Sequence, residues 1–508
     1  MSYFIGVDIG TSGTKTVLFS GLGETIASST IEYPMYQPQN GWAEQDANDW
    51  WNATVASIKS VISKSGVSNE EIKGIGISGQ MHGLVMLDAE GKVLRNSIIW
   101  CDQRTAKECE EITSKIGKER LIEITANPAL TGFTASKILW VKNNEPHIYE
   151  KCRKILLPKD YIRFMLSGEF ATEVSDASGM QLIDINTRDW SDEVLTKLGI
   201  DKSLLSRVYE SYEVSSTVNG LAAELTGLKV WTPIVGGAGD QAAGAVGNGI
   251  IREGVVSSTI GSSGVVFAHT NAPILDMQGR VHTFCHAVPN AWHVMGVTQG
   301  AGLSLKWFRD TFCHEEIREA ERLAIDPYAL LDQAAAGVPV GANSLLYLPY
   351  LMGERTPHLD PNARGVFFGL SAIHTKNDML RAVMEGVAFS LKDSMEIIKA
   401  TGIKINEVRA SGGGGKSQLW RQIQADVYDC SVATVSSTEG PALGVAILAA
   451  VGTKEYSSVG EACDAIIRNK DLVKPDARSV EKYSKQYSLY TKLYPALRNS
   501  FTELEKLR

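Results

Sequence analysis

A short glycine-rich turn occurs twice in the chain, about half a chain length apart. Residues 9–14 read IGTSGT and residues 260–265 read IGSSGV, and each copy lies between two runs of residues typical of strands. This spacing predicts that the 508-residue chain folds as two related halves rather than around one core. Because glycine and serine are common, six residues could match by chance, so the placement of the copies carries more weight than their identity.

The composition excludes several classes of protein. The sequence is 44% hydrophobic, and its net charge is -8 without any run of lysines and arginines. Nucleic acid and anionic membranes are therefore not expected as partners, and the expected ligand is small. The seven cysteines form no CxxC pair, no stretch has about 18 uninterrupted apolar residues, and no signal peptide is expected. These features predict a cytoplasmic protein without a membrane segment, and they leave the oligomeric state open, a homodimer included.

The first copy of the turn is preceded by an acidic residue. Asp8 lies near the end of a predicted strand, and the hairpin turn that follows is residues 10–13. Backbone amides and hydroxyls of such a turn can converge on an anion, and a carboxylate beside them can hold hydrated Mg²⁺. The turn therefore predicts a phosphate and metal site with Thr11 and Ser12 at the phosphate, a purely structural hairpin turn being the alternative. In the second copy Thr259 replaces the acid, so the two turns could hold one polyphosphate from opposite sides.

A second acidic residue, Asp240, lies near the middle of the chain in the stretch IVGGAGDQAAGAVG, residues 234–247. The stretch begins apolar, passes through three glycines and continues through small residues, as a strand does when it ends in a tight turn before a closely packed helix. The carboxylate is therefore predicted at a strand end, facing a cleft between the two halves, where ligands preferentially bind. We interpret Asp240 as a general base, with a helix N-cap or turn aspartate as the alternative.

Two further glycine-rich segments follow predicted strands. The segment SGQMHG, residues 78–83, places His82 on a loop between strands, where a substrate contact is favoured over a structural hydrogen bond. Residues 412–417 read GGGGKS and separate a strand from a helix, so a nucleotide could approach the helix N-terminus, although the spacing differs from a Walker A motif. Asp102 and Arg104, after another strand, either bind hydroxyls or pair with each other.

From residue 3 to about residue 452 the sequence resembles the FGGY family of sugar kinases. Residues 132–145 are similar to the first signature of that family, and GVFFGLSAIHTKNDMLRAVME, residues 365–385, is similar to the second. The resemblance implies an α/β fold of the actin-like (ribonuclease H-like) ATPase type, with two domains that are each a mixed sheet flanked by helices, and a cleft between them. The expected domains are residues 1–245, which bind sugar and metal, and residues 246–508, which bind the nucleotide.

The resemblance also implies a reaction, in which ATP and Mg²⁺ phosphorylate a small sugar. SGQMHG, LPKDYIRFMLSGE and PYLMGERTPH are most similar to the members of the family that act on D-xylulose. Transfer to the terminal hydroxyl of that sugar gives D-xylulose 5-phosphate, an intermediate of pentose catabolism. Kinases for ribulose, gluconate or glycerol are alternatives with the same machinery, and an actin-like ATPase without a sugar substrate is an alternative of another class.

Carried over by the resemblance, the functional roles fall on particular residues of this chain. Asp240 is the expected catalytic base, and Asp8 is the acid expected to hold Mg²⁺ through water. Met81, His82 and Gln241 are expected to bind the sugar, with Gln241 standing where relatives often have asparagine. The expected nucleotide contacts, which include the turn and glycine-run residues already described, are Thr11, Ser12, Ser262, Gly302, Gly413, Gly414 and Gln418.

Overall fold

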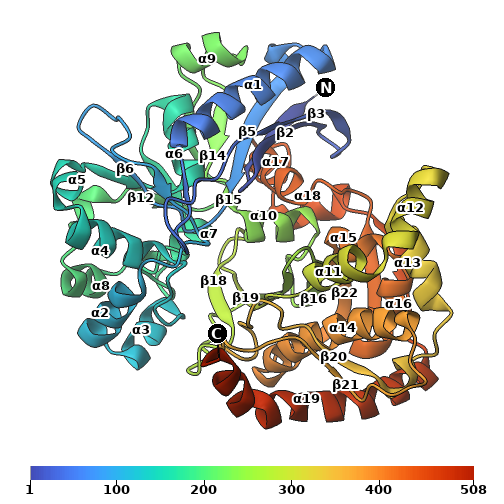
Figure 1. The fold of residues 1–508 in the computed structure, drawn as a ribbon. Helices are drawn as coiled ribbons and strands as arrows, with labels where there is room; N and C mark the ends of the chain where they lie inside the picture. Colours follow the sequence, from blue (N-terminus) through green and yellow to red (C-terminus); the bar gives the residue numbers. More distant parts are fainter. Residues whose placement is uncertain (1, 508) are drawn as a thin grey trace.

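The computed structural model describes residues 2–507, and they form two α/β halves that are each built on a mixed sheet (Figure 1). The strands of the first sheet, in spatial order, are β13 (Val214–Thr217), β14 (Pro233–Val235), β5 (Ile72–Gly79), β1 (Tyr3–Ile9), β2 (Gly13–Ser20) and β3 (Thr25–Glu32), with β15 (Ala238–Gly239) also paired to β5. The strands of the second are β18 (His282–Cys285), β19 (Trp292–Thr298), β17 (Gly264–Thr270), β16 (Gly254–Ile260), β22 (Ile405–Ser411), β23 (Ser431–Val435) and β24 (Asn469–Val473).

The two sheets share one topology, which confirms the repeat predicted from the two turns. β1 pairs antiparallel with β2 and parallel with β5, and β16 pairs in the same way with β17 and β22. Both turns are closed by a 3.0 Å hydrogen bond, from Gly10 N to Gly13 O and from Gly261 N to Ser263 O. Because parallel neighbours end at the same edge of a sheet, each turn lies next to the end of a second strand.

Helices complete both halves. Those of the first half are α1 (Ala47–Ser65), α2 (Ala106–Ile116), α3 (Lys118–Thr125), α4 (Thr134–Asn144), α5 (Pro146–Lys151), α6 (Pro158–Ser167), α7 (Val174–Ser178), α8 (Asp192–Leu198), α9 (Gly220–Thr226) and α10 (Asp240–Gly247). Those of the second are α11 (Gly302–Phe312), α12 (His314–Leu323), α13 (Pro327–Ala336), α14 (Lys376–Ala400), α15 (Gly412–Lys416), α16 (Gln418–Tyr428), α17 (Gly440–Gly452), α18 (Val459–Ile466) and α19 (Ala477–Glu505). None of the helices in residues 2–507 combines the length and the apolar character needed to cross a membrane.

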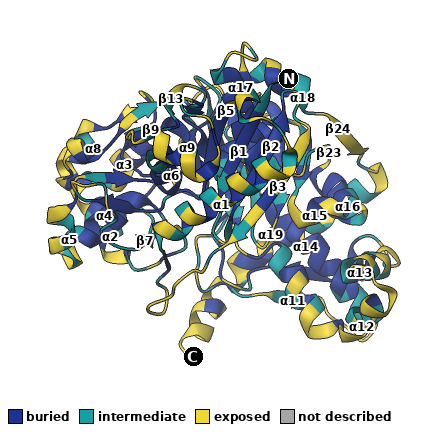
Figure 2. Cartoon of the chain, turned by 90° about the horizontal axis from the view of Figure 1, so that it is seen from above, coloured by how far each residue is buried: buried dark blue, intermediate teal, exposed yellow. Residues whose placement is uncertain are grey.

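Short strand pairs lie outside the two main sheets. They are β4 (Glu44–Gln45) with β7 (Ser97–Ile98), β6 (Val85–Leu87) with β8 (Lys154–Leu156), β9 (Ala171–Glu173) with β12 (Arg207–Tyr209), β10 (Ile183–Asp184) with β11 (Asp189–Trp190), and β20 (Leu346–Leu348) with β21 (Val366–Phe368). Figure 2 shows the central strands β1 and β2 in the buried interior, and exposed residues on outlying helices such as α12 and α13.

Strand β1 is buried on both faces, and alternate residues serve different partners. Ile5 and Val7 pack in one core with α1, whereas Phe4 packs in another core with α17. Gly6 belongs to the α17 face as well, because a Cβ there would lie 1.9 Å from the carbonyl oxygen of Ala442. Successive side chains of a strand point to opposite faces, so Asp8 continues the series of Phe4 and Gly6 and leaves the sheet on the α17 side.

Helix α17 comes from the second half of the sequence but packs on the first sheet (Figure 1). Nearly all of its residues are buried, and they are apolar or small around the whole circumference, as expected for a helix enclosed on every side. It contacts β1, β5 and α10. Its approach to α10 depends on glycine, because a Cβ at Gly444 would lie 1.8 Å from the carbonyl oxygen of Ala243. The two halves therefore share a closely packed pair of helices at the centre of the molecule.

Candidate active site

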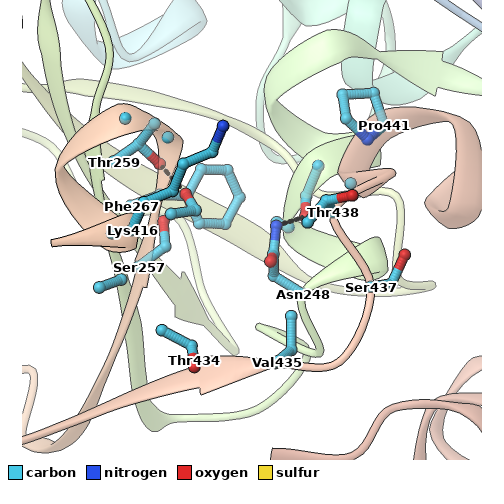
Figure 3. Close-up of a pocket in the computed structure, with 18 of the residues that line it drawn as sticks. Asn248, Ser257, Thr259, Phe267, Lys416, Thr434, Val435, Ser437, Thr438 and Pro441 are labelled. Atoms are coloured by element: carbon cyan, nitrogen blue, oxygen red, sulfur yellow. Dashed lines mark hydrogen bonds between the residues drawn. The ribbon is translucent and has the colours of Figure 1, made fainter. Parts of the chain in front are cut away.

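A cavity of about 850 Å³ lies between the two halves, and residues of both line it. The first half contributes Lys15, Asp240 and Gln241. In Figure 3, Thr259 and Lys416 lie on one side of the cavity. Figure 3 also shows Ser437, Thr438 and Pro441 on the opposite side. A cavity of this size, with polar groups at its walls, suits a ligand of nucleotide size.

Asp240 lies where the sequence predicted, at the end of β15 and on the cavity wall. It is the first residue of α10, and Gly239 occupies the N-cap, so the alternative of an aspartate N-cap is wrong. Its carboxylate accepts hydrogen bonds from the backbone N of Gln241 at 2.9 Å and from Nε2 of Gln241 at 3.2 Å. Burial and then the charge of Asp8 raise the pKa of Asp240 to about 7. A carboxylate with a pKa near neutral pH is suited to accept a proton.

Asp8 lies beside Ser78 in the parallel register of β1 and β5. Burial raises its pKa, while the Ser78 hydroxyl and the charge of Lys15 act in the opposite direction. Its Oδ1 is buried and has no hydrogen-bond partner in the described chain. Such an oxygen fits hydrated Mg²⁺, which takes one or two carboxylates and fills its other positions with water and phosphate oxygens. Within residues 2–507 no cluster of three or more His, Cys, Asp or Glu could hold a metal ion.

The imidazole of His82 is fixed by Gly179 at the end of α7. Its Nδ1 lies 2.7 Å from the carbonyl oxygen of Gly179, and because a carbonyl only accepts, Nδ1 carries the hydrogen. Burial and the charge of Lys137 lower the pKa of His82 to about 3, so the ring is neutral near pH 7. Nε2 is then an acceptor. With this tautomer the ring can accept a hydrogen bond through Nε2 but cannot donate one there.

Met81 connects His82 to the Asp240 region. A Cβ at Gly239 would lie 2.8 Å from Cγ of Met81, and a Cβ at Gly179 would lie 2.8 Å from its Cε. The pairing of β15 with β5 sets Gly239 beside Gly79, two residues before Met81. The structure thus places Met81 against Gly239, the residue before Asp240, and places His82 next to Met81 in the same loop.

The expected nucleotide residues are more scattered. Gly413 lines the cavity, together with Gly412, Gly415 and Lys416. Of the others, Ser12, Ser262 and Gln418 are exposed and Thr11 is half-buried. In the described part of the chain the residues expected at the nucleotide that lie outside the lining of this cavity are Thr11, Ser12, Ser262, Gly302, Gly414 and Gln418.

Two of these residues are placed by packing against the second turn. Gly302 begins α11, and its backbone N donates to the carbonyl oxygen of Gly261 at 2.8 Å. A Cβ at Gly302 would lie 2.4 Å from that oxygen. Gly414 is buried, and a Cβ there would lie 2.6 Å from the side chain of Ile260. Glycine is therefore required at both positions for close backbone approach.

The glycine run corrects the sequence analysis in one respect. The sequence predicts an open run before a helix, but residues Gly412–Lys416 are themselves helical, as α15. Gly412 has φ +72°, and it bridges to Ile260 as the sheet ends. The hydroxyl groups of Thr259 and Ser411 lie 2.7 Å apart beside it. The glycine run thus packs closely against the second turn, and this close packing explains why glycines are present although they weaken a helix.

Asp102 and Arg104 pair with each other, which resolves the two alternatives left open by the sequence. Nε of Arg104 lies 3.0 Å from both carboxylate oxygens of Asp102, and Nη2 lies 2.8 Å from Oδ2. Oδ2 also accepts from the backbone N of Ala43 at 2.6 Å, and the guanidinium lies 3.7 Å from the ring centroid of Trp42. Both residues therefore hold the loop structure and are not exposed for hydroxyl binding.

The sequence did not predict the buried ion pairs that pack against the end of β5. Lys159 is fully buried and forms ion pairs with Asp160, Glu173 and Asp176, and a Cβ at Gly79 would lie 3.1 Å from Cβ of Lys159. This ion cluster packs under the strand end that leads to Met81. The LPKD sequence stands out only through its resemblance to the family, because an isolated lysine gives no local sign of burial.

Two related α/β halves with a ligand cavity between them define the fold of the actin-like ATPases. Residues 3–247 match the N-terminal domain of the FGGY family of carbohydrate kinases, and residues 256–453 match its C-terminal domain. The chain belongs to this family. The enzyme is therefore a carbohydrate kinase, which transfers a phosphoryl group from ATP to a sugar hydroxyl.

Individual relatives agree with this assignment over their full length. The chain is 39% identical to the xylulose kinase of Bacillus subtilis (strain 168) over 508 residues, which is 100% of both chains. It is 32% identical to the gluconokinase of Bacillus licheniformis over 505 residues, 99% of this chain and 98% of the relative. The structure of ligand-bound xylulose kinase from Lactobacillus acidophilus is similar with a TM-score of 0.92 at 28% identity, over 99% of this chain and 100% of that one.

Proposed function

We propose that this kinase phosphorylates D-xylulose at its terminal hydroxyl and releases D-xylulose 5-phosphate and ADP. The observation that carries the reaction is Asp240, whose carboxylate has a pKa of about 7 and lines the cavity between the halves. D-Xylulose as the acceptor is supported by the 39% identity to the Bacillus subtilis xylulose kinase over the whole chain.

In this proposal Asp240 is the general base. Its carboxylate takes the proton of the attacking hydroxyl as that oxygen bonds to the γ-phosphorus of ATP and the bond to the ADP oxygen breaks. Gln241 holds both carboxylate oxygens, so the base is presented in one orientation. Phosphoryl transfer requires little covalent chemistry from the protein, and positioning of the two reactants supplies most of the catalysis.

The sugar is bound in this proposal by Met81, His82 and Gln241. Met81 is 5% exposed and offers an apolar surface next to Gly239. His82 accepts from a sugar hydroxyl through Nε2, because its Nδ1 is already bound to Gly179. The backbone at His82 has φ +71°, a conformation that few residues adopt, so the loop holds the ring in place at a cost in strain.

The nucleotide phosphates lie in this proposal between the two turns and α15. The exposed hydroxyls of Ser12 and Ser262 are available from opposite halves, and Thr11 lies next to the first of them. Gly413 and Gly414 provide backbone at the second turn, and the residues that complete the proposed nucleotide site are Gly302 and Gln418. Asp8 would hold Mg²⁺ through water, and the ion, when bound, neutralises phosphate charge.

The test is ADP release with a panel of acceptors. Turnover should be highest in kcat/KM with D-xylulose, lower with D-ribulose, D-gluconate and glycerol, and low without any acceptor. The product should carry its phosphate on the terminal carbon by ³¹P NMR. A higher kcat/KM with D-gluconate would replace the proposed acceptor, and ADP release that ignores the acceptor would contradict a sugar substrate altogether.

A further inference from the structure

Arg355 is a half-buried cation without a partner. It lies in the loop between β20 and β21, and its guanidinium makes no hydrogen bond or ion pair with any residue of the described range 2–507. Burial lowers the pKa of Arg355 to about 10, and no carboxylate opposes this shift. Buried charges are usually paired, because removing an unpaired charge from water is costly, and part of this cost applies to a half-buried guanidinium. A guanidinium left free in this way indicates a ligand group that pairs with it.

The backbone of Arg355 is held rigidly, so its free side chain is not the result of a loose loop. Glu354 accepts hydrogen bonds through Oε1 from the backbone N of Arg355 at 2.7 Å and of Gln299 at 2.9 Å. The next residue, Thr356, donates from its backbone N to the carbonyl oxygen of Val297 at 2.9 Å. The loop is thus bound to the end of β19 on both sides of Arg355.

The loop of Arg355 is bound to the start of β18, because Oγ1 of Thr356 donates to the carbonyl oxygen of Arg280 at 2.7 Å, two residues before His282. The charge of Arg355 lowers the pKa of both His82 and His282, so the guanidinium lies within electrostatic reach of both rings. The same rings are joined by aromatic contacts, since the centroid of Phe284 lies 6.0 Å from that of His82 and 6.2 Å from that of His282. Arg355 belongs to the second half, whereas His82 belongs to the first.

Lys137 also lies beside His82, and burial lowers the pKa of its amine to about 7. Nζ of the buried Lys137 donates to the carbonyl oxygens of His82 at 2.8 Å and Gly132 at 2.7 Å. His82 is neutral and, through Nε2, an acceptor. Asp240 is an acceptor when ionised. Lys137 already donates to two carbonyl oxygens, whereas the guanidinium of Arg355 has no acceptor among the described residues.

We infer that Arg355 binds the carbonyl oxygen of the open-chain ketose, at the end of the sugar away from the phosphorylated hydroxyl. The inference rests on the proposed function. A guanidinium only donates hydrogen bonds, and in an open-chain ketose the carbonyl oxygen is the one that only accepts, whereas hydroxyls can donate to His82 and Asp240. Arg355 is thus a specificity-determining residue that distinguishes a ketose from the corresponding polyol.

The test compares two acceptors that differ at this one oxygen, D-xylulose and xylitol. Arg355→Gln should lower kcat/KM for D-xylulose roughly 10- to 100-fold, mainly through KM, as expected for the loss of a hydrogen bond from a charged donor. The value for xylitol should change less than about threefold, and KM for ATP should stay unchanged. Arg364→Gln is the matched control, because Arg364 lies in the same loop but already donates to Pro361, Ala363 and Glu505.

Several outcomes would overturn the inference. Equal losses for D-xylulose and xylitol would make Arg355 structural, and a change confined to KM for ATP would place it at the nucleotide. Arg355→Lys, which keeps the charge, should recover part of the preference for D-xylulose over xylitol. It replaces Arg355→Gln as the test if circular dichroism shows that the glutamine variant does not fold. A parent enzyme without activity on D-xylulose would remove the proposed function and this inference together, whereas an active parent with an unchanged preference in both variants would remove the inference alone.

Discussion

The carboxylates of Asp8 and Asp240 interact electrostatically, and their surroundings suit them to different tasks. Asp8 has a buried oxygen without a partner, whereas both oxygens of Asp240 are held by Gln241. The charge of Asp8 adds to burial in raising the pKa of Asp240 to about 7. Pairs of acids whose environments separate their roles are a common basis of acid-base catalysis at neutral pH.

Asp240→Asn tests the general base directly. The asparagine keeps the size of the side chain but cannot accept the proton, so kcat should fall about 10² to 10⁴-fold while dissociation constants for sugar and ATP stay within a few-fold. In the parent enzyme, kcat/KM for D-xylulose should rise with pH through a midpoint near 7, because Asp240 must be ionised. Single-turnover transfer and equilibrium binding on one preparation measure both. Near-normal transfer by the variant would contradict the assignment.

The same pKa predicts that the stability of the fold falls as pH rises, whereas activity rises. The folded-state pKa of about 7 exceeds the ordinary value of 3.8, so the protonated carboxyl stabilises the fold at low pH and this contribution is lost as pH rises through 7. Asp240→Asn should therefore raise Tm relative to the parent more at pH 8 than at pH 5, because the loss of stability extends from pH 3.8 to about 7. Scanning calorimetry without ligands measures the difference between variant and parent, in which other titrating groups cancel. A Tm difference between variant and parent that did not change with pH would show that the pKa of Asp240 is the same in the folded and unfolded states.

His82→Ala should affect sugar binding selectively. Loss of the acceptor Nε2 and of the ring leaves a sugar hydroxyl without its partner, which costs about 1–3 kcal/mol. KM for D-xylulose should rise accordingly, while KM for ATP should not change. Because the pKa of His82 is about 3, the pH profile between 5 and 8 should keep the single step assigned to Asp240. Steady-state kinetics across this range decide the point, and unchanged sugar kinetics would reduce His82 to a structural residue of the loop.

At the scale of elements, glycines determine how closely the two halves approach. Gly444 of α17 lies against Ala243 of α10, and a Cβ there would be 1.8 Å from a backbone carbonyl oxygen, which cannot rotate away. Gly444→Ala should therefore separate the helices and destabilise the fold by about 1–3 kcal/mol. Since α10 begins with Asp240, kcat should fall as well.

Thermal melting and kinetics of Gly444→Ala measure this effect, with Gly220→Ala as the matched control. Gly220 begins α9, and a Cβ there would have no atom within 4 Å among the described residues, so the added methyl should be neutral or slightly stabilising. Equal Tm values for the two variants would show that α10 and α17 can move apart at little cost in stability, and that their contact does not position Asp240.

Elements with local signals could be predicted from the sequence, and elements set by distant packing could not. Helix α1 (Ala47–Ser65) has such local signals, because Asp46 caps it and its apolar residues recur at helical spacing. The glycine run forms a helix against Ile260, which the run itself does not encode. The tautomer of His82 likewise depends on Gly179, distant in sequence. The positions of Asp8 and Asp240 were predictable because each lies at or near a strand end and close to glycines.

At the scale of the whole molecule, the first sheet is completed by the second half of the chain. The core on the inner face of the first sheet contains Phe4, Val17 and Phe19 together with Leu443 and many other residues of α17. The domain boundary expected from the sequence, between residues 245 and 246, stays a prediction. A first domain that ended at residue 245 would lack α17, which covers this face of the first sheet.

A fragment of residues 1–245 should therefore fail to reach a fixed tertiary structure alone. Removal of α17 exposes apolar residues of β1 and β2 together with glycine positions that α17 backbone occupies, so the fragment should bind ANS and lose its near-UV circular dichroism signal while keeping helical far-UV signal. Joining residues 440–467 to it through a flexible linker should restore the near-UV signal, because α17 and α18 cover the exposed face. The full chain, by contrast, should melt in one calorimetric transition, since neither half has a complete core without the other. A fragment 1–245 that melts cooperatively with native near-UV signal would show that the first sheet is stable without α17, and the coupling of the halves through the α10–α17 contact would then have to be weak.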